Sequence, residues 1–394
     1  MTVKTILRKK DMILENEDLE PLYTMRQFPI YMGVTDDSRE HDMFADEVWK
    51  ISKGSGMIQL EELVPTEILY KKSHNSSIGK VWKRHHESFS RFLHENMGGG
   101  RGILEIGGGN GILNVVFHQV FAAVPWTIVE PSNVEALPGC SGEYIKEFWK
   151  SPFPFERISG TYDTLVHSHL MEHQFELNEF MELNASALHE GEAMVFSVPN
   201  MMELLMRKYP YALNFEHTYF ISEDYIDRIL EKYGFEVKRK EYFEDHSIFY
   251  CAVKRAEREA GVTVNPFQDA AEMKRLYDKN KRLFCEYVEY YRDKVKKLND
   301  QIFSYRGDIY LFGAHINTQL LINFGLNTDR IKAVLDNDVL KQTHRMYGTD
   351  LMVLSPKVLA DEERPLVICM MGAYTSEIEE DILENINETV CFAE

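Results

Sequence analysis

The residues with the clearest chemical potential form a glycine-rich run between an apolar segment and a helical one. The run consists of Gly107, Gly108, Gly109, Asn110 and Gly111. Glu105 precedes it by two positions, and the next apolar segment ends in Glu130, about 20 residues further on. Glycines at a strand-to-helix turn let a ligand approach backbone amides, and a carboxylate after the next strand accepts hydrogen bonds from ribose hydroxyls. The run therefore predicts a nucleoside-containing cofactor.

An acid inside the first strand separates this pattern from a dinucleotide site, which usually has only the second acid. Glu105-Ile-Gly-x-Gly-x-Gly resembles the first motif of class I S-adenosylmethionine-dependent methyltransferases. Segments 129–132, 162–173 and 197–200 are similar to the family's second motif, fourth strand and fifth strand, in the same order. The resemblance implies S-adenosyl-L-methionine as cofactor, bound by Glu105, the glycine-rich run, Glu130, Pro131 and Ser132, with His167 and His169 lining the sulfonium pocket.

The elements that must position these residues alternate between strands and helices. Short apolar runs predict strands at 102–107, 126–130, 163–167 and 193–198, and helical spacing recurs over 76–96, 112–121 and 223–233. This order predicts an α/β fold with a parallel, doubly wound, Rossmann-like sheet. Segment 268–303 predicts a long amphipathic helix, and strands at 309–313, 331–336 and 366–370 predict a second α/β domain.

Four parts follow from this pattern. Residues 1–72, irregular and acidic, predict an N-terminal lid or substrate subdomain, and 73–256 predict the cofactor-binding domain. Residues 257–304 are expected to form a helical connector, and 305–394 a C-terminal α/β substrate-binding domain.

A second group of polar residues follows the predicted fifth strand. Asn214-Phe-Glu-His-Thr-Tyr-Phe220 resembles the Glu-His-x-x-Tyr-Phe element of sugar C-methyltransferases, which act on nucleotide-activated keto-hexoses. Carbon methylation requires a base beside the carbon next to a ketone, and the resemblance implies that His217 is that base. It also implies that Glu216 orients a substrate hydroxyl or takes part in proton transfer. His74 aligns with a tyrosine that the family places near the sugar, and this histidine either donates to the same oxygen or reflects a changed substrate.

The chain departs from the zinc-bearing relatives at its N-terminal module. Their Cys-x-x-Cys-Gly element corresponds here to Ser52-Lys-Gly-Ser55-Gly, and no cysteine occurs before Cys140. Serine is a poor zinc ligand, so we expect a degenerate module without metal. The run 169–173 matches the H-x-x-E-H zinc motif, but it falls after the fourth strand, and we expect Glu172 and His173 to make structural hydrogen bonds there. The loop 313–318 lacks the lysine and second glycine common in the family's C-terminal domain, which weakens the case for nucleotide diphosphate binding there.

Composition limits the remaining function classes. The formal net charge of −19 argues against a nucleic-acid partner. The N-terminus lacks a secretory pattern, and no apolar run reaches membrane-spanning length, so a cytoplasmic protein without membrane contact is expected. The five cysteines are scattered, which disfavours a disulfide framework. We expect a monomer or small homo-oligomer acting on a small molecule, in particular a nucleotide sugar. The alternatives are oxygen or nitrogen methylation of another small anionic metabolite, and a non-catalytic nucleotide- or sugar-binding protein.

Overall fold

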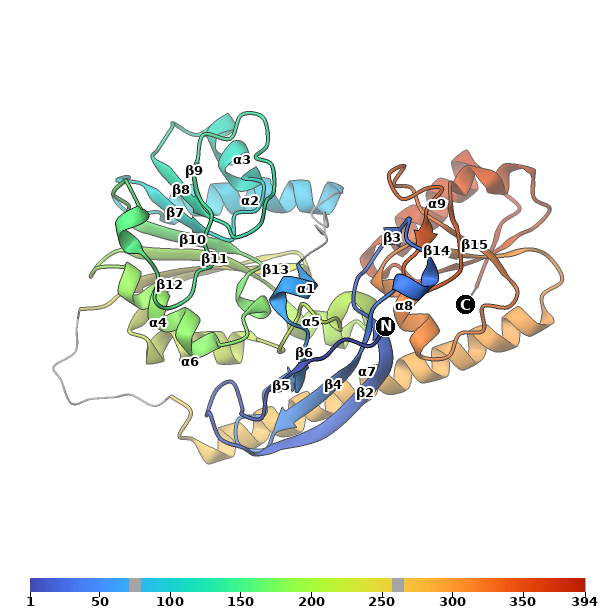
Figure 1. Ribbon diagram of the computed structural model, residues 1–394, viewed down its shortest axis with the longest axis horizontal. Helices are drawn as coiled ribbons and strands as arrows, with labels where there is room; N and C mark the ends of the chain where they lie inside the picture. Colours follow the sequence, from blue (N-terminus) through green and yellow to red (C-terminus); the bar gives the residue numbers. More distant parts are fainter. Residues whose placement is uncertain (71–78, 257–265, 394) are drawn as a thin grey trace.

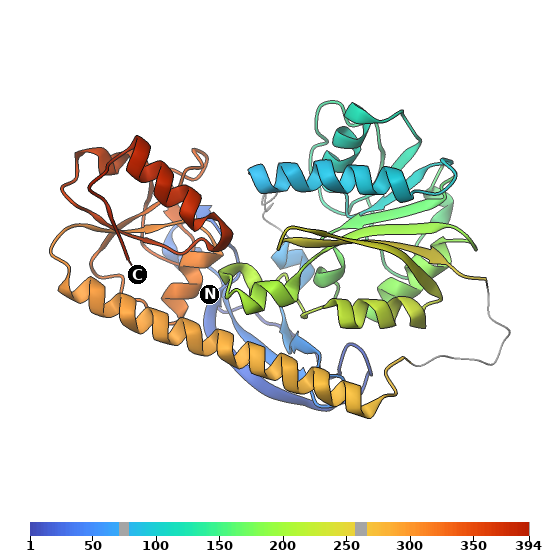
Figure 2. The same ribbon diagram turned by 180° about the vertical axis from the view of Figure 1, so that it is seen from behind.

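A long helix organises the molecule. The computed structural model describes residues 1–70, 79–256 and 266–393. Helix α7 (Ala270–Ser304) runs beneath the other parts, and the N-terminal strands lie along it (Figures 1 and 2). Its buried side chains, among them Phe284, Tyr291 and Val295, pack into a core shared with the N-terminal and C-terminal parts. The predicted amphipathic helix is thus present, and its apolar face joins distant parts of the chain.

The largest sheet has seven strands in the order β12-β13-β11-β10-β7-β8-β9. Their bounds are β7 Ile103–Ile106, β8 Trp126–Val129, β9 Glu143–Ile145, β10 Thr164–Ser168, β11 Ala193–Pro199, β12 Phe235–Phe243 and β13 Ser247–Lys254. The five strands from β9 to β11 are parallel, whereas β13 pairs antiparallel with both β11 and β12. The predicted α/β fold is confirmed, with an antiparallel hairpin added at one edge.

Helices cover both faces of this sheet. The apolar residues of α2 (Lys80–Asn96) and α3 (Ile112–Val120) pack into one core, and those of α4 (Leu177–Ala187) and α6 (Glu223–Lys232) pack into another. Helix α5 (Met201–Met206) follows β11. Because β7 and β10 are central neighbours, the loops after them meet at one sheet edge, where ligands bind in open α/β sheets.

The N-terminal part is more regular than its sequence predicts. Strands β2 (Leu19–Pro29), β4 (Phe44–Ser52) and β5 (Ile58–Leu60) form an antiparallel sheet. Two short pieces, β1 (Ile6–Leu7) and β6 (Glu62–Leu63), pair with each other, and α1 is Thr66–Leu69. In the turn between β4 and β5, Ser52 Oγ accepts from the Gly54 and Ser55 amides at 3.2 and 3.0 Å. Side-chain hydrogen bonds thus hold this turn.

The C-terminal part is a second, smaller α/β unit. Its strands are β14 Ile309–Phe312, β15 Ile331–Leu335, β17 Val353–Leu354, β18 Leu366–Cys369 and β19 Cys391–Phe392. They run parallel in the order β17-β15-β14-β18-β19, with helices α8 (Ile316–Asn323) and α9 (Thr375–Asn385) between them. The predicted strands are present within a residue or so of their expected bounds.

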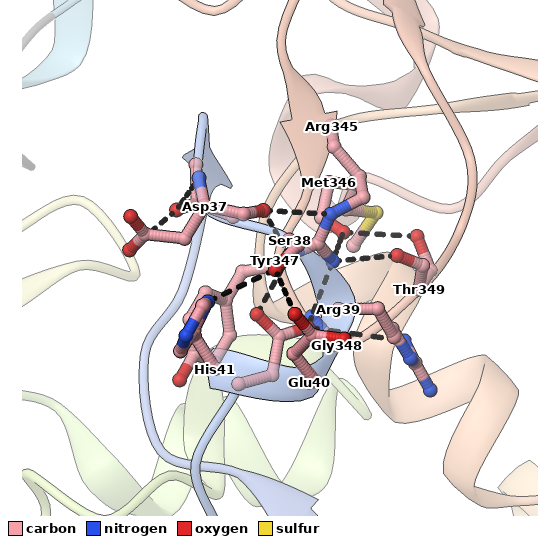
Figure 3. A network of polar contacts seen from close by, with 12 residues as sticks. Asp37, Ser38, Arg39, Glu40, His41, Arg345, Met346, Tyr347, Gly348 and Thr349 are labelled. Carbon is pink, nitrogen blue, oxygen red and sulfur yellow. Dashed lines mark hydrogen bonds and ion pairs between the residues drawn. The ribbon is translucent and has the colours of Figure 1, made fainter.

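The two ends of the chain meet at a polar junction (Figure 3). Strand β3 (Val34–Thr35) pairs antiparallel with β16 (Arg345–Met346). The guanidinium of Arg345 donates to both oxygens of the fully buried Asp42 at 2.7 and 2.8 Å, and also to the Asp37 and Thr349 carbonyls. A buried charge pair therefore fixes the N-terminal part on the C-terminal one. None of the helices in the described ranges is long and apolar enough to cross a bilayer.

Candidate functional site

The turn between β7 and α3 has the backbone conformation that its glycines allow. Gly107, Gly109 and Gly111 have φ values of 69°, 53° and 79°. The Gly109 amide donates to one oxygen of Glu130 and the Ser132 amide to the other, both at 2.9 Å. The acid after β8 is therefore locked against the glycine turn, with its carboxylate at the carboxyl edge of the sheet.

This turn has the form that an adenosyl cofactor requires. A Cβ at Gly109 would have no atom within 4 Å, so the turn is open on that side. Helix α3 begins at Ile112, and its N-cap residue Gly111 makes no side-chain cap, which leaves the amino end of the helix available to a polar ligand. S-adenosylmethionine fits these donors together with the Glu130 carboxylate.

Glu105 lies beneath the turn, although we expected direct cofactor contact. It is 4% exposed and accepts a hydrogen bond from Trp126 Nε1 at 2.8 Å. A Cβ at Gly108 would come within 2.8 Å of the Glu105 carboxyl carbon. Burial raises the pKa of Glu105 to about 7. Its carboxyl group thus supports the turn from below.

Segment 131–145 covers part of the turn, which sequence reasoning did not anticipate. The Leu137 amide donates to the Asn110 carbonyl at 2.9 Å, and the Tyr144 hydroxyl donates to the Gly109 carbonyl at 3.2 Å. Pro131 is exposed. Tyr144 lies on β9, so its contact depends on strand pairing and not on a local motif.

The two histidines expected beside the sulfonium occupy different environments. His167 is fully buried in β10 and its ring lies 4.8 Å from that of Phe196, in a stacked arrangement. Alternate residues of a strand point to opposite faces of the sheet, and the His167 ring lies on the face that α4 covers, 5.4 Å from the ring of Phe180. His167 therefore belongs to the hydrophobic core. His169 lies in the loop after β10 with φ of 49°. Next to it, Leu170 packs on Gly107. This loop therefore touches the glycine turn of residues 107–111 between β7 and α3, which we call the cofactor turn.

The loop after β10 brings Glu172 and His173 to His217. In this group, one ligand-type atom of each residue lies within 4.8 Å of the others. His173 Nδ1 contacts the Glu216 carbonyl at 2.8 Å, so the predicted Glu216–His217 pair adjoins the loop. Both Glu172 and His173 lie in the 3₁₀ helix η3 (Met171–His173). Glu172 and His173 thus belong to the candidate site; His173 makes a hydrogen bond of the kind we expected, whereas the Glu172 side-chain oxygens have no hydrogen-bond partner within the described ranges.

The environments of Glu172 and His217 shift their proton affinities in opposite directions. Glu172 is fully buried, and its oxygens have no hydrogen-bond partner within the described ranges; His169 Nδ1 and His173 Nε2 lie 3.5 and 3.6 Å away. Burial raises the pKa of Glu172 to about 8 and lowers that of His217 to about 4. At neutral pH the site therefore holds a carboxylic acid near a neutral imidazole, a combination suited to acid–base chemistry.

The surroundings of His217 allow either neutral tautomer. His217 Nδ1 lies 3.3 Å from the Ala212 carbonyl and 3.1 Å from Asn214 Nδ2. Asn214 Oδ1 accepts from the Glu216 and His217 amides, so its nitrogen is the atom that faces the ring. When Nδ1 donates to the Ala212 carbonyl, Nε2 is left with a lone pair that can accept a proton.

His74 lies outside the described residues. Tyr70, which follows α1, interacts electrostatically with Glu216, Glu172 and Glu130. The end of α1 is therefore close to both the acid of the cofactor turn and the Glu172 group.

The C-terminal part repeats the turn geometry. The Gly313 amide donates to the Leu335 carbonyl at 2.8 Å, as Gly107 does to Val129, and the Ala314 amide donates to Asp336 at 2.9 Å. Here Lys341 Nζ lies 3.1 Å from the same Asp336 oxygen and balances its charge. The second turn thus combines an acid with a cation, although it lacks the lysine of the usual loop.

Two family models match the chain. Residues 81–240 match a model described as a methyltransferase domain, and residues 247–391 match one described as a C-methyltransferase C-terminal domain. Together with the cofactor turn, these matches identify an S-adenosylmethionine-dependent methyltransferase with a C-methyltransferase C-terminal domain.

Solved structures resemble the chain only distantly. Magnesium protoporphyrin IX methyltransferase from Synechocystis PCC 6803, with bound SAH, is 18% identical over 46% of this chain and 90% of its own, with a TM-score of 0.35. The 1,6-didemethyltoxoflavin-N1-methyltransferase of Burkholderia thailandensis is 14% identical over 45% and 82%, also with a TM-score of 0.35. No curated protein matches the chain.

Proposed function

We propose that this S-adenosylmethionine-dependent methyltransferase methylates the carbon next to the ketone of a nucleotide-linked deoxysugar, by way of an enolate. The observation that carries the proposal is the group formed by the buried Glu172 and the half-buried His173 and His217 beside the cofactor turn. An enolate-forming reaction needs a base and a proton donor at one place, and this group contains both. The match to a C-methyltransferase C-terminal domain supports carbon as the acceptor atom.

In this proposal His217 removes the proton from the carbon. Its Nε2 carries the lone pair when Nδ1 donates to the Ala212 carbonyl. The negative charge then moves to the ketone oxygen, where a neutral carboxylic acid at Glu172 donates a hydrogen bond. His217 thus removes the proton and Glu172 stabilises the oxygen. Burial shifts the pKa values of these two groups in opposite directions, so that one is a neutral base and the other a neutral acid.

The cofactor-binding residues are a separate set on the same sheet edge. Glu130 accepts hydrogen bonds from the ribose hydroxyls, and the amino end of α3 faces the polar part of the ligand. S-adenosylmethionine, when bound, supplies an electrophilic methyl group. Leu170, packed on Gly107, holds the loop that carries Glu172 and His173 against the cofactor-binding residues. The protein then contributes mainly by holding the reacting carbon in line with the methyl group of the cofactor.

The sugar is proposed from two features. The Glu216–His217 element resembles that of sugar C-methyltransferases, and the C-terminal part offers the Gly313 turn with Asp336 and Lys341. The acid accepts hydrogen bonds from a ribose, and the lysine attracts a phosphate. We therefore assign the nucleotide to this turn and the ketone to the Glu172 group.

The proposal is tested with methyl-labelled S-adenosylmethionine and a panel of nucleotide-linked keto-deoxysugars in D₂O. We expect a methyl group on carbon and, without cofactor, deuterium exchange next to the ketone. His217→Asn should lower both rates by about 100-fold or more, while calorimetry shows unchanged S-adenosylhomocysteine binding. His189→Asn, at an exposed position, is the matched control and should behave as wild type.

Two results would refute the proposal. Transfer of the label to oxygen or nitrogen with every substrate would exclude carbon methylation. Full deuterium exchange and turnover in His217→Asn would exclude this residue as the base.

A further inference from the structure

Three imidazoles that the proposed reaction does not use converge under α2. His85 lies on α2, His169 in the loop after β10, and His246 in the turn between β12 and β13. One ring nitrogen of each lies within 4.8 Å of the others, and the ring centroids are 5.3 to 5.5 Å apart. Three elements far apart in the sequence thus present three nitrogen donors to one point.

The hydrogen bonds of these rings leave a nitrogen of His85 available to bind a ligand. His85 Nε2 lies 2.9 Å from Ser197 Oγ, and His169 Nε2 and His246 Nδ1 lie 2.9 and 2.6 Å from Ser247 Oγ. His85 is fully buried, and its Nδ1 has no hydrogen-bond partner in the part of the chain that the structure describes. A buried polar atom without a partner is unfavourable, and a ligand bound to it would offset that cost.

The surroundings favour a cation over an anion. Glu172 lies 3.5 Å from His169 Nδ1, and a carboxyl group in this position orients the imidazole of a metal ligand. The nearby cation Arg84 on α2 is paired with Glu244. Trp82 closes the cluster, with its ring 4.9 Å from His169 and 4.7 Å from His246.

We infer that His85, His169 and His246 form a site for a divalent transition-metal ion of the zinc type. Three neutral imidazoles with a fourth position left for water are a common donor set for Zn²⁺, with Zn–N distances of about 2.0–2.1 Å. The ion would tie α2, the loop after β10 and the β12–β13 turn together. Because that loop also carries Glu172 and His173, the metal would fix the acid–base group without being part of it.

The test uses the full chain purified through a tag without histidine and stripped with a chelator. Calorimetry with Zn²⁺ should show one ion bound per chain, and Co²⁺ should give the visible absorption bands of a four-coordinate site. His246→Asn, in a surface turn, should weaken Zn²⁺ binding by about 100-fold or more and remove the Co²⁺ bands. His189→Asn, exposed and distant in sequence from the cluster, should bind as wild type.

His169→Asn provides a second variant, since His85→Asn risks misfolding in the core. Circular dichroism confirms that each variant is folded. The inference is overturned if wild type binds neither ion, if His246→Asn and His169→Asn both bind as wild type, or if His217→Asn alone abolishes binding. Because binding is measured without cofactor or sugar, its failure leaves the proposed methyl transfer untouched, and failure of methyl transfer leaves the metal result standing.

Discussion

Two glycines of the cofactor turn provide a matched pair of substitutions that separates stability from binding. Gly109→Ala and Gly111→Ala both place a Cβ at positive φ, which costs about 1–2 kcal/mol for a left-handed residue. At Gly111 the Cβ would also lie 2.5 Å from Cys140 Sγ and 2.7 Å from the Tyr144 hydroxyl. This crowding adds about 1–3 kcal/mol, so Gly111→Ala should lose about 2–5 kcal/mol in total. Urea unfolding followed by fluorescence measures both losses.

Binding should show the opposite order. A Cβ at Gly109 meets no protein atom within 4 Å, because it points to the open side of the turn where the cofactor is assigned. Gly109→Ala should therefore weaken S-adenosylhomocysteine binding by at least about 10-fold, which corresponds to about 1.4 kcal/mol. Gly111→Ala should change the affinity less in the fraction that remains folded. Wild-type affinity in Gly109→Ala would refute the assignment of the open side to the cofactor, and equal stability losses would refute the packing estimate.

Three further predictions concern buried ionisable side chains. Arg345→Met leaves the buried Asp42 with only the half-exposed Arg39, at 3.9 Å, and should lower the free energy of unfolding by about 3–5 kcal/mol in urea titrations. Recovery is expected when Asp42→Leu is added, and no loss would contradict the pairing. Burial raises the pKa of Glu47, fully buried beside Trp49, from 4.5 to about 8. The stability provided by the protonated Glu47 side chain is complete below pH about 4.5 and is lost as the pH rises through 8. Glu47→Gln should therefore reduce the fall in the free energy of unfolding between pH 6 and pH 9. An unchanged pH dependence of this free energy would contradict the prediction. For Glu172, with a pKa raised to about 8, methyl transfer should decline as the pH rises through 8, and Glu172→Gln, which keeps a donor, should retain activity without that decline; the same decline in both proteins would assign it to another group.

Local patterns predicted the framework of the cofactor turn. Glycines after a short apolar run define a tight strand-to-helix turn, and the acid after the next strand lies at the same edge because parallel neighbours end together. Glu130 and Gly109 are in direct contact for this reason. The long amphipathic helix and the second α/β unit were also predictable, since their apolar residues keep one period over many positions.

The N-terminal sheet was missed because its buried face contains polar residues. In β4 the inward positions alternate regularly, but Glu47 occupies one of them, between Ala45 and Trp49. Buried and half-buried positions alternate along β4, but apolar and polar residue types do not. Only the packing of this strand against α7 and the C-terminal part shows that a carboxyl group lies in the core.

The sequence by itself determined the class of the cofactor and the order of the elements, because both depend on neighbours within a few positions or on adjacent parallel strands. The tertiary structure decided which face each side chain takes. It placed Glu105 beneath the turn and His167 in the core, and it brought Glu172 and His173 to His217 and His85 to His246. These contacts join residues dozens of positions apart, so they arise from how helices and loops pack on the sheet and leave no local pattern in the chain.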